Sequence, residues 1–147
     1  MKFDSYIQNK TAKDSIYCKK NIFVSAFHGS DDNIIEFIRF EEKKDHFVWA
    51  QADEICFVKS ADHYIKALTQ CGGYFKWMTR HSTIKELLEV LIGENFIRLN
   101  KFYLLNLDHF SHINGDGINI FLKDDVSIPV THRISPYMLQ SLKSTRT

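Results

Sequence analysis

From Ile34 onward the chain consists of short runs of alternating apolar and polar residues, and turn residues separate one run from the next. The runs are rich in β-branched and aromatic side chains, a composition typical of β-strands. We predict strands at residues 34–40, 47–51, 54–60, 64–69, 74–79, 96–99, 102–105, 109–113, 118–122 and 126–130. Because the connections are short, these strands favour antiparallel sheets over parallel β-α-β units.

Four of the connections contain residues that favour turns. Residues 41–45 are a charged stretch that predicts a turn after the first of these strands. Cys71-Gly72-Gly73 predicts a hairpin, because glycine adopts positive φ angles without strain. Residues 114–117 and 123–125 predict two further turns closer to the end of the chain.

One helix interrupts the strands, over residues 83–91. Ser82 or Thr83 is placed to cap its first turn, and Glu86 lies three residues after Thr83, as in a capping box. Gly93 follows as a terminator. The apolar positions that recur at helical spacing are Ile84, Leu87, Leu88 and Leu91.

A second, short helix is predicted near the end of the chain. Ser135 is its expected cap and Pro136 suits the first helical position. The apolar residues that fall on one side of it are Met138, Leu139 and Leu142. These patterns predict a mainly β fold with one or two short helices.

The chain has 147 residues, of which 44% are hydrophobic, enough to bury the core of one domain. Residues 1–32 show no clear period, so we interpret them as an N-terminal extension of unknown structure that precedes a single domain at residues 33–147. No secretory signal or apolar run of membrane-spanning length is present. We therefore expect a cytoplasmic protein without membrane contact.

The charge balance excludes one class of binding protein, and the cysteine content indicates the redox compartment. The 19 Lys and Arg residues nearly balance 18 Asp and Glu residues, which excludes a polybasic protein that binds nucleic acids or membranes through bulk charge. The three cysteines are odd in number and widely spaced, and Cys56 lies in an apolar run where it would pack as a small hydrophobic residue. This usage indicates a reducing compartment.

No motif indicates an enzyme. His109 and His112 lie three residues apart in a predicted strand, where this spacing places them on opposite faces, and His132 is distant in sequence. Cys71 follows a strand in a hairpin, with no base or helix start beside it to make it a nucleophile. The glycines match no phosphate-binding loop. We expect no catalytic site, no metal site and no cofactor.

Cationic and hydrogen-bonding side chains gather instead at the predicted strand ends and turns, where they can protrude into a groove of a nucleic acid. They are Lys59, His63, Arg80, His81, Arg98, Asn100, Lys101, His132 and Arg133. Structural alternatives remain for several of them. Arg98 alternates with apolar neighbours, as on the solvent side of a strand, Asn100 and Lys101 fit a simple turn, and residues 132–133 fit a solvated connection.

Four blocks of sequence, in order along the chain, resemble the LytTR DNA-binding domain, the output module of bacterial regulators. Residues 53–64 are similar to the family's D-I-x-y-I-e-a-x-x-n-Y stretch, and residues 83–91 to its t-L-k-e-L-e-x-x-L helix. Residues 96–107 resemble F-x-R-i-H-r-S-y-l-V-N-l, and residues 128–133 resemble i-P-V-S-r-r. The resemblance spans residues 34–143.

The third block is the most specific of the four. The positions at which it agrees with the family are Phe96, Arg98, Lys101, Tyr103 and Asn106. Asn100 and Phe102 depart from the family's usual His and Ser. In the fourth block, Thr131 and His132 replace the usual Ser and first basic residue.

The resemblance implies an elongated fold of mostly antiparallel sheets that reads the major groove of double-stranded DNA with loops. It implies DNA contacts at His63, Asn100, Lys101, His132 and Arg133, with Lys59 and Arg98 as further candidates for phosphate. Two copies are expected on direct repeats, with a homodimer possible. Because only the short extension precedes the domain, we expect a stand-alone transcriptional regulator without a receiver domain. The alternative is a protein-interaction module that retains the scaffold but has lost DNA readout, a hypothesis that exposure of Phe102 would favour.

Overall fold

The computed structural model describes residues 15–19, 22–28, 34–91 and 95–144. Its strands are β1 (Ser15–Lys19), β2 (Ile22–His28), β3 (Ile34–Lys43), β4 (His46–Gln51), β5 (Ile55–Ala61), β6 (Tyr64–Cys71), β7 (Tyr74–Arg80), β8 (Phe96–Arg98), β9 (Tyr103–Asn106), β10 (Phe110–Ile113), β11 (Asn119–Leu122) and β12 (Ser127–Pro129). The α-helices are α2 (Ile84–Val90) and α3 (Pro136–Ser144). Short 3-10 turns lie at Ala52–Glu54, Leu107–His109 and Lys123–Asp125.

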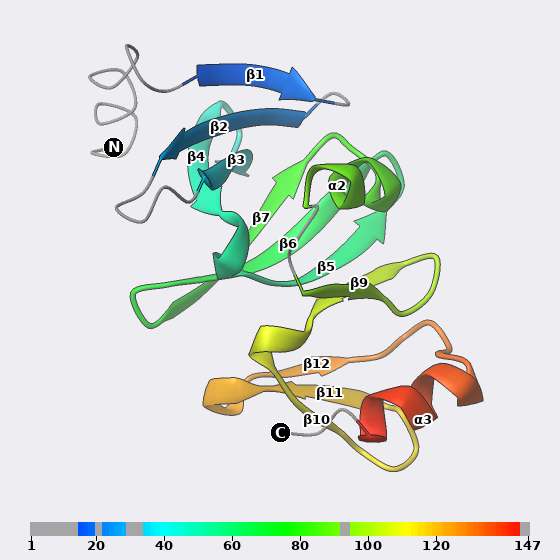
Figure 1. Ribbon diagram of the computed structural model, residues 1–147. Coiled ribbons are helices and arrows are strands. Elements are labelled where there is room, and N and C mark those ends of the chain that lie inside the picture. Colours follow the sequence, from blue (N-terminus) through cyan, green and yellow to red (C-terminus); the bar gives the residue numbers. More distant parts are fainter. Residues whose placement is uncertain (1–14, 20–21, 29–33, 92–94, 145–147) are drawn as a thin grey trace.

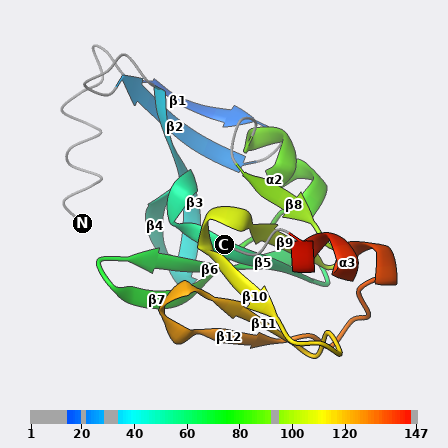
Figure 2. The same cartoon turned by 60° about the horizontal axis from the view of Figure 1, so that its bottom comes forward.

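Within the described residues the strands form two antiparallel sheets. The larger has the order β1-β2-β3-β7-β6-β5-β9-β8, with β4 paired to β3, and the smaller has the order β10-β11-β12. Figures 1 and 2 show the larger sheet in the middle, with α2 on one side and the smaller sheet and α3 on the other. The predicted class, a mainly β fold with two short helices, is confirmed.

The predicted strands from residue 34 onward all appear, with ends shifted by a few residues. The interpretation of residues 41–45 as a turn is wrong for residues 41–43, because Glu41 and Lys43 pair with Phe47 and His46 and thus extend β3. Only Lys44 and Asp45 form the turn, and Asp45 has a φ angle of 60°.

The segment before residue 33, for which the sequence suggests no shape, contributes β1 and β2. Strand β2 pairs with β3 from Val24↔Ile38 to His28↔Ile34, so part of the expected extension continues the large sheet. Residues 1–14 lie outside the described residues.

The central strands are buried on both faces because they lie between two cores. On β9, Leu104 packs in the core under α2, whereas Tyr103 and Leu105 pack in the core shared with the smaller sheet and α3. Strand β5 does the same with Val58 on one side and Phe57 on the other. Alternation of side chains along these strands thus decides which of the two cores each residue joins.

Local signals fix the helices and the hairpin as predicted. Thr83 caps α2, with its side chain accepting from the Glu86 N–H while the Glu86 carboxylate accepts from the Thr83 N–H. Ser135 caps α3. Gly72 and Gly73 have φ angles of 61° and 87° and connect β6 to β7, a geometry that favours glycine. Gly93, the expected terminator of α2, lies outside the described residues.

Asn106 is a buried polar residue, 1% exposed, that joins two strands to a turn. Its Nδ2 donates to the Ile55 carbonyl at 2.8 Å, and its Oδ1 accepts from the Asp108 N–H at 2.9 Å. Both backbone groups would lose their partner without this side chain.

We therefore expect Asn106→Ala to lower the free energy of unfolding by about 2 kcal/mol, the usual cost of leaving buried backbone groups unsatisfied. Urea unfolding followed by circular dichroism measures the change. The exposed Asn95→Ala, whose amide donates to the Asp108 carboxylate, serves as control and should change stability by less than about 0.5 kcal/mol. Equal effects of both substitutions would contradict the role of Asn106.

Candidate nucleic-acid interface

Three connections meet at one end of the strands, and we call the surface that they form the loop edge. They are the β5–β6 turn (62–63), the β8–β9 loop (99–102) and the segment after β12 (130–135). Antiparallel pairing of Lys59 with Tyr103 places the end of β5 beside the start of β9. The Ser60 N–H donates to the Phe102 carbonyl at 2.8 Å and joins the first two connections.

Asn100 joins the β8–β9 loop to the segment after β12. Its Nδ2 donates to the carbonyls of His132 (3.2 Å) and Arg133 (3.1 Å). Its Oδ1 accepts from the N–H groups of Phe102 (2.8 Å) and Tyr103 (2.9 Å). A primary amide has two N–H groups and two lone pairs to offer, so the hydrogen-bonding capacity of Asn100 is used within the protein.

Tyr103 is the second support of the loop edge. Its ring is buried, at 3% exposed, and its hydroxyl accepts from the backbone N–H groups of Thr131 (2.9 Å) and His132 (3.0 Å). The same hydroxyl lies 2.9 Å from Oγ1 of Thr131. A residue of the large sheet therefore determines the path of the segment after β12.

Two of the four family departures, Phe102 and His132, lie against each other. The rings of Phe102 and His132 stack with centroids 3.8 Å apart and an interplanar angle of 24°. Phe102 is 37% exposed, so its ring is neither a core residue nor fully free. His132 Nδ1 also lies 3.3 Å from the Tyr103 hydroxyl, which fixes the position of the imidazole.

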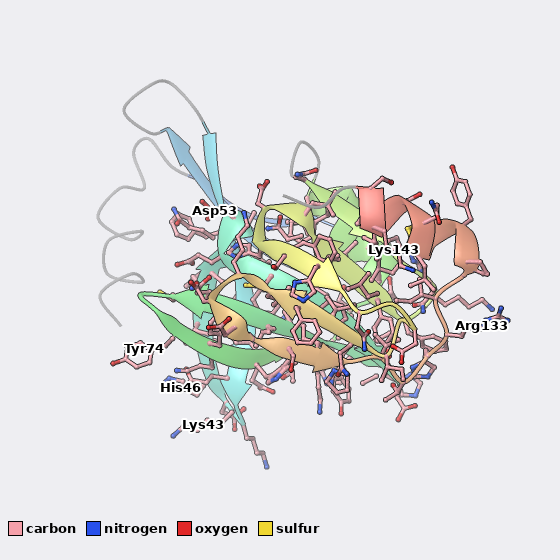
Figure 3. All side chains as sticks on the ribbon, turned by 90° about the horizontal axis from the view of Figure 1, so that it is seen from below. Lys43, His46, Asp53, Tyr74, Arg133 and Lys143 are labelled. Atoms are coloured by element: carbon pink, nitrogen blue, oxygen red, sulfur yellow. The ribbon has the colours of Figure 1, made fainter. Side chains whose placement is uncertain are left out.

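The side chains that the loop edge exposes to solvent include two cations, Lys101 and Arg133, and one carboxylate, that of Asp62. His63, Lys101 and Arg133 are exposed, each on a different one of the three connections. In Figure 3 Arg133 lies at one end of the molecule and projects outward, whereas Lys43, His46 and Tyr74 lie at the opposite end. The structure thus brings His63, Asn100, Lys101, His132 and Arg133 together on one surface; DNA contact by them stays a prediction.

Arg98 and Lys59 have different positions from these five. The guanidinium of Arg98 donates to the carbonyls of Asn100 (3.2 Å) and Lys101 (3.3 Å), so it braces the β8–β9 loop from its base. Lys59 lies on the face of the large sheet, with its Nζ 4.7 Å from the centroid of the Trp77 ring. It lines a hollow of about 380 Å³ against β12.

Sequence reasoning found the cations of this surface but missed its main support, Tyr103. The available signal was indirect: Tyr103 is a residue with a polar tip in an otherwise apolar run, and a buried phenol needs a hydrogen-bond partner. Its partners Thr131 and His132 are 28 and 29 residues away, a separation that no local pattern reveals.

The groups considered for catalysis or metal binding are occupied or far apart. Within the described residues, no three His, Cys, Asp or Glu side chains are placed to hold a metal ion. His109 Nε2 lies 2.6 Å from the Asp53 carbonyl, and the His112 ring stacks on Phe121. A hydrogen bond with the Glu54 carboxylate raises the pKa of Cys71, which keeps its thiol protonated rather than nucleophilic.

Cys56 is buried among apolar residues, as its position in the sequence suggests. Burial raises the pKa of the Cys56 thiol to about 12, so it packs as a neutral side chain. In the described part of the chain, no helix is both long and apolar enough to cross a membrane.

Comparisons with known proteins give a family and a similar fold. The family model described as the LytTr DNA-binding domain matches residues 45–143. Among solved structures, the LytTr DNA-binding domain of a putative methyl-accepting/DNA response regulator from Bacillus cereus is similar in fold, with a TM-score of 0.52 and 13% sequence identity. The similarity covers 74% of this chain and 94% of that one. No curated protein matches this chain.

If the Tyr103 hydroxyl holds the segment after β12, Tyr103→Phe should release it. We expect faster amide hydrogen exchange at Thr131 and His132 and a loss of about 1–3 kcal/mol in unfolding free energy, because two backbone N–H groups lose their acceptor. Tyr137→Phe removes a hydroxyl from a residue that is 80% exposed and should change neither quantity. Unchanged exchange in Tyr103→Phe would show that the loop edge does not depend on this hydroxyl.

Proposed function

Because the family match covers residues 45–143, this chain belongs to the LytTr family of DNA-binding domains, and we propose that it is a sequence-specific transcriptional regulator that reads the major groove with its loops. The family assignment confirms the resemblance drawn from the four sequence blocks. The observation that supports the finer proposal is the loop edge, on which three connections are held together and each exposes a cationic or hydrogen-bonding side chain. The family is one of DNA-binding domains rather than enzymes, and we propose no catalytic activity.

Each side chain of the loop edge has a role that suits its chemistry. Arg133 can form paired hydrogen bonds with a guanine edge or a phosphate, and Lys101 can pair with a phosphate. His63 and the ring of His132 can donate to base edges or backbone oxygens. Arg98 and Asn100 hold the loop that carries Lys101, since their donors are used within the protein.

The electrostatics of the chain set the kind of binding we expect. The net charge is +1, so attraction to phosphate must come from a few placed side chains rather than from the whole surface. Each neutralised phosphate releases counterions, and affinity should therefore fall as salt concentration rises, with a slope proportional to the number of phosphate contacts. Recognition of bases would then be needed to select one site among many.

We further propose that two copies bind direct repeats on one duplex, with or without a dimer in solution. A regulator of this kind acts where the chromosome is, so we place it in the cytoplasm and expect no membrane partner. These proposals rest on the family and on the small size of a single loop edge, which offers few base contacts on its own.

A second candidate function is a protein-interaction module on the same scaffold. The observation in its favour is the Phe102 ring, which replaces the family's usual Ser and is 37% exposed on the loop edge. An exposed aromatic ring can anchor a partner protein. The stack of Phe102 on His132 is equally compatible with DNA, because it holds the imidazole in place beside the cations.

Selection from random duplex DNA with the purified protein, at low and at physiological salt, separates the two functions. We expect enrichment of a repeated motif that persists at physiological salt. Enrichment of no motif, or binding that weakens equally for all sequences as salt rises, would contradict sequence-specific readout and favour the interaction module.

Replacement of both exposed cations, Lys101→Ala with Arg133→Ala, should abolish motif-specific binding without unfolding the domain. At about 2 kcal/mol for each charge-assisted contact, the loss corresponds to roughly a thousandfold in Kd, measured by fluorescence anisotropy on the selected motif. The control removes the same charge from turns at the opposite end of the strands, as Lys44→Ala with Lys123→Ala. Retained binding by the first double variant would show that the contacts lie elsewhere.

A further inference from the structure

Phe102 is the exposed apolar residue of the loop edge, since every other side chain that the three connections expose is polar or charged. Its ring is 37% exposed. Lys101 precedes Phe102 on the β8–β9 loop, and Arg133 follows its stacking partner His132 on the segment after β12. A phenyl ring thus shares this surface with the two cations that we propose to contact DNA.

The exposed ring belongs to a series of aromatic rings that begins in the core. Phe57 is fully buried, and its ring lies 5.3 Å from the ring of Tyr103. The Tyr103 ring meets the His132 imidazole edge-on at 5.8 Å, and this imidazole stacks on Phe102 at 3.8 Å. Contacts between aromatic rings in these arrangements are favourable. The Phe102 ring therefore has a support that extends back to strand β5.

The backbone of Phe102 is fixed as well. Its N–H donates to Asn100 Oδ1 at 2.8 Å, and its carbonyl accepts from the Ser60 N–H at 2.8 Å. Both backbone groups of this exposed residue are thus bonded to other parts of the loop edge. A side chain held at its backbone and on one face of its ring loses little conformational entropy when a partner covers the rest.

The major groove offers one apolar substituent that suits such a ring. Guanine, cytosine and adenine present hydrogen-bond donors and acceptors there, whereas thymine adds its C5 methyl group. Contact between this methyl group and an apolar side chain is a recognised way to read a thymine. An exposed phenyl ring on a surface that reads the major groove is therefore matched in chemistry to a thymine.

Insertion of the ring between two base pairs is the other use of an apolar side chain on DNA. A wedge of this kind must turn the faces of its ring toward the separated bases. The His132 imidazole covers one face of Phe102, at 3.8 Å and with an interplanar angle of 24°. Insertion would require loss of this stack, whereas contact through the exposed part of the ring retains it.

We propose that Phe102 contacts the methyl group of a thymine in the major groove and thereby selects thymine at one position of the DNA site. The proposal rests on the proposed function, in which the loop edge reads the major groove, and it names the base that one side chain selects. The His132 imidazole supports the ring, and Lys101 and Arg133 supply the charge that holds the duplex against it.

The test removes the methyl group from the DNA and the ring from the protein, singly and together. The probe is the duplex motif that the wild-type protein selects from random DNA, with each thymine replaced in turn by deoxyuridine, which lacks only the C5 methyl group. The variant is Phe102→Ser. The control is Tyr74→Ser, which removes a ring that is 79% exposed at the opposite end of the molecule from Arg133 (Figure 3). Fluorescence anisotropy gives Kd, and circular dichroism checks folding.

At one thymine of the motif, we expect deoxyuridine to raise the Kd of the wild type and of Tyr74→Ser about fourfold, the effect of burying one methyl group. Phe102→Ser should bind the thymine and deoxyuridine duplexes equally, because the ring that meets the methyl group is gone. Selection with Phe102→Ser should return the same motif with a weaker preference at that position.

A Phe102→Ser variant that retains the fourfold difference would overturn the proposed contact. A selected motif without thymine, or a wild type that binds every deoxyuridine duplex as tightly as the motif, would also overturn it, and these two results do not depend on the folding of the variant. In each of these cases the wild type still selects a motif, so the proposed function stands. A wild type that selects no motif would overturn the proposed function and this inference together.

Discussion

Burial of β5 and β9 on both faces is the constraint on which the rest of the domain depends. A strand with apolar residues on each side needs a cover on each side, and here α2 supplies one while the smaller sheet and α3 supply the other. The smaller sheet packs against the same face of the large sheet as Tyr103. The segment that follows β12 therefore lies beside the start of β9, where the Tyr103 hydroxyl accepts from the N–H groups of Thr131 and His132. The loop edge is the outcome of this packing, since its three connections meet where the covered strands end.

Most of the fold could be predicted from local pattern. The Thr83 capping box, the Gly72-Gly73 hairpin and the alternating strands are decided within a few residues, and each agrees with the tertiary structure. The prediction from sequence fails where pairing with a neighbouring strand outweighs the local amino-acid composition. The charged residues Glu41 and Lys43 continue β3 because β4 offers partners for them, and β2 forms although its sequence carries no clear period, because β3 provides its edge.

The candidate site could be predicted as a set of positions but not as a set of roles. Turns expose their side chains, so Lys101 and Arg133 were recognisable as surface cations and His63 as an exposed hydrogen-bonding group. Asn100 looks the same in sequence, yet its amide is used to hold the carbonyls of residues 132 and 133, more than thirty positions away.

The hydrogen bonds of Asn100 and Tyr103 have a consequence for selectivity. A loop that orders only on binding loses conformational entropy at that step and can shift to accommodate a poor match. Connections already fixed to each other and to a buried strand avoid that entropy loss and have little freedom to adapt. In the DNA readout that we propose, such a preorganised surface would leave a misplaced partner group without a hydrogen bond. Stiffness would then add to the discrimination that the exposed side chains provide.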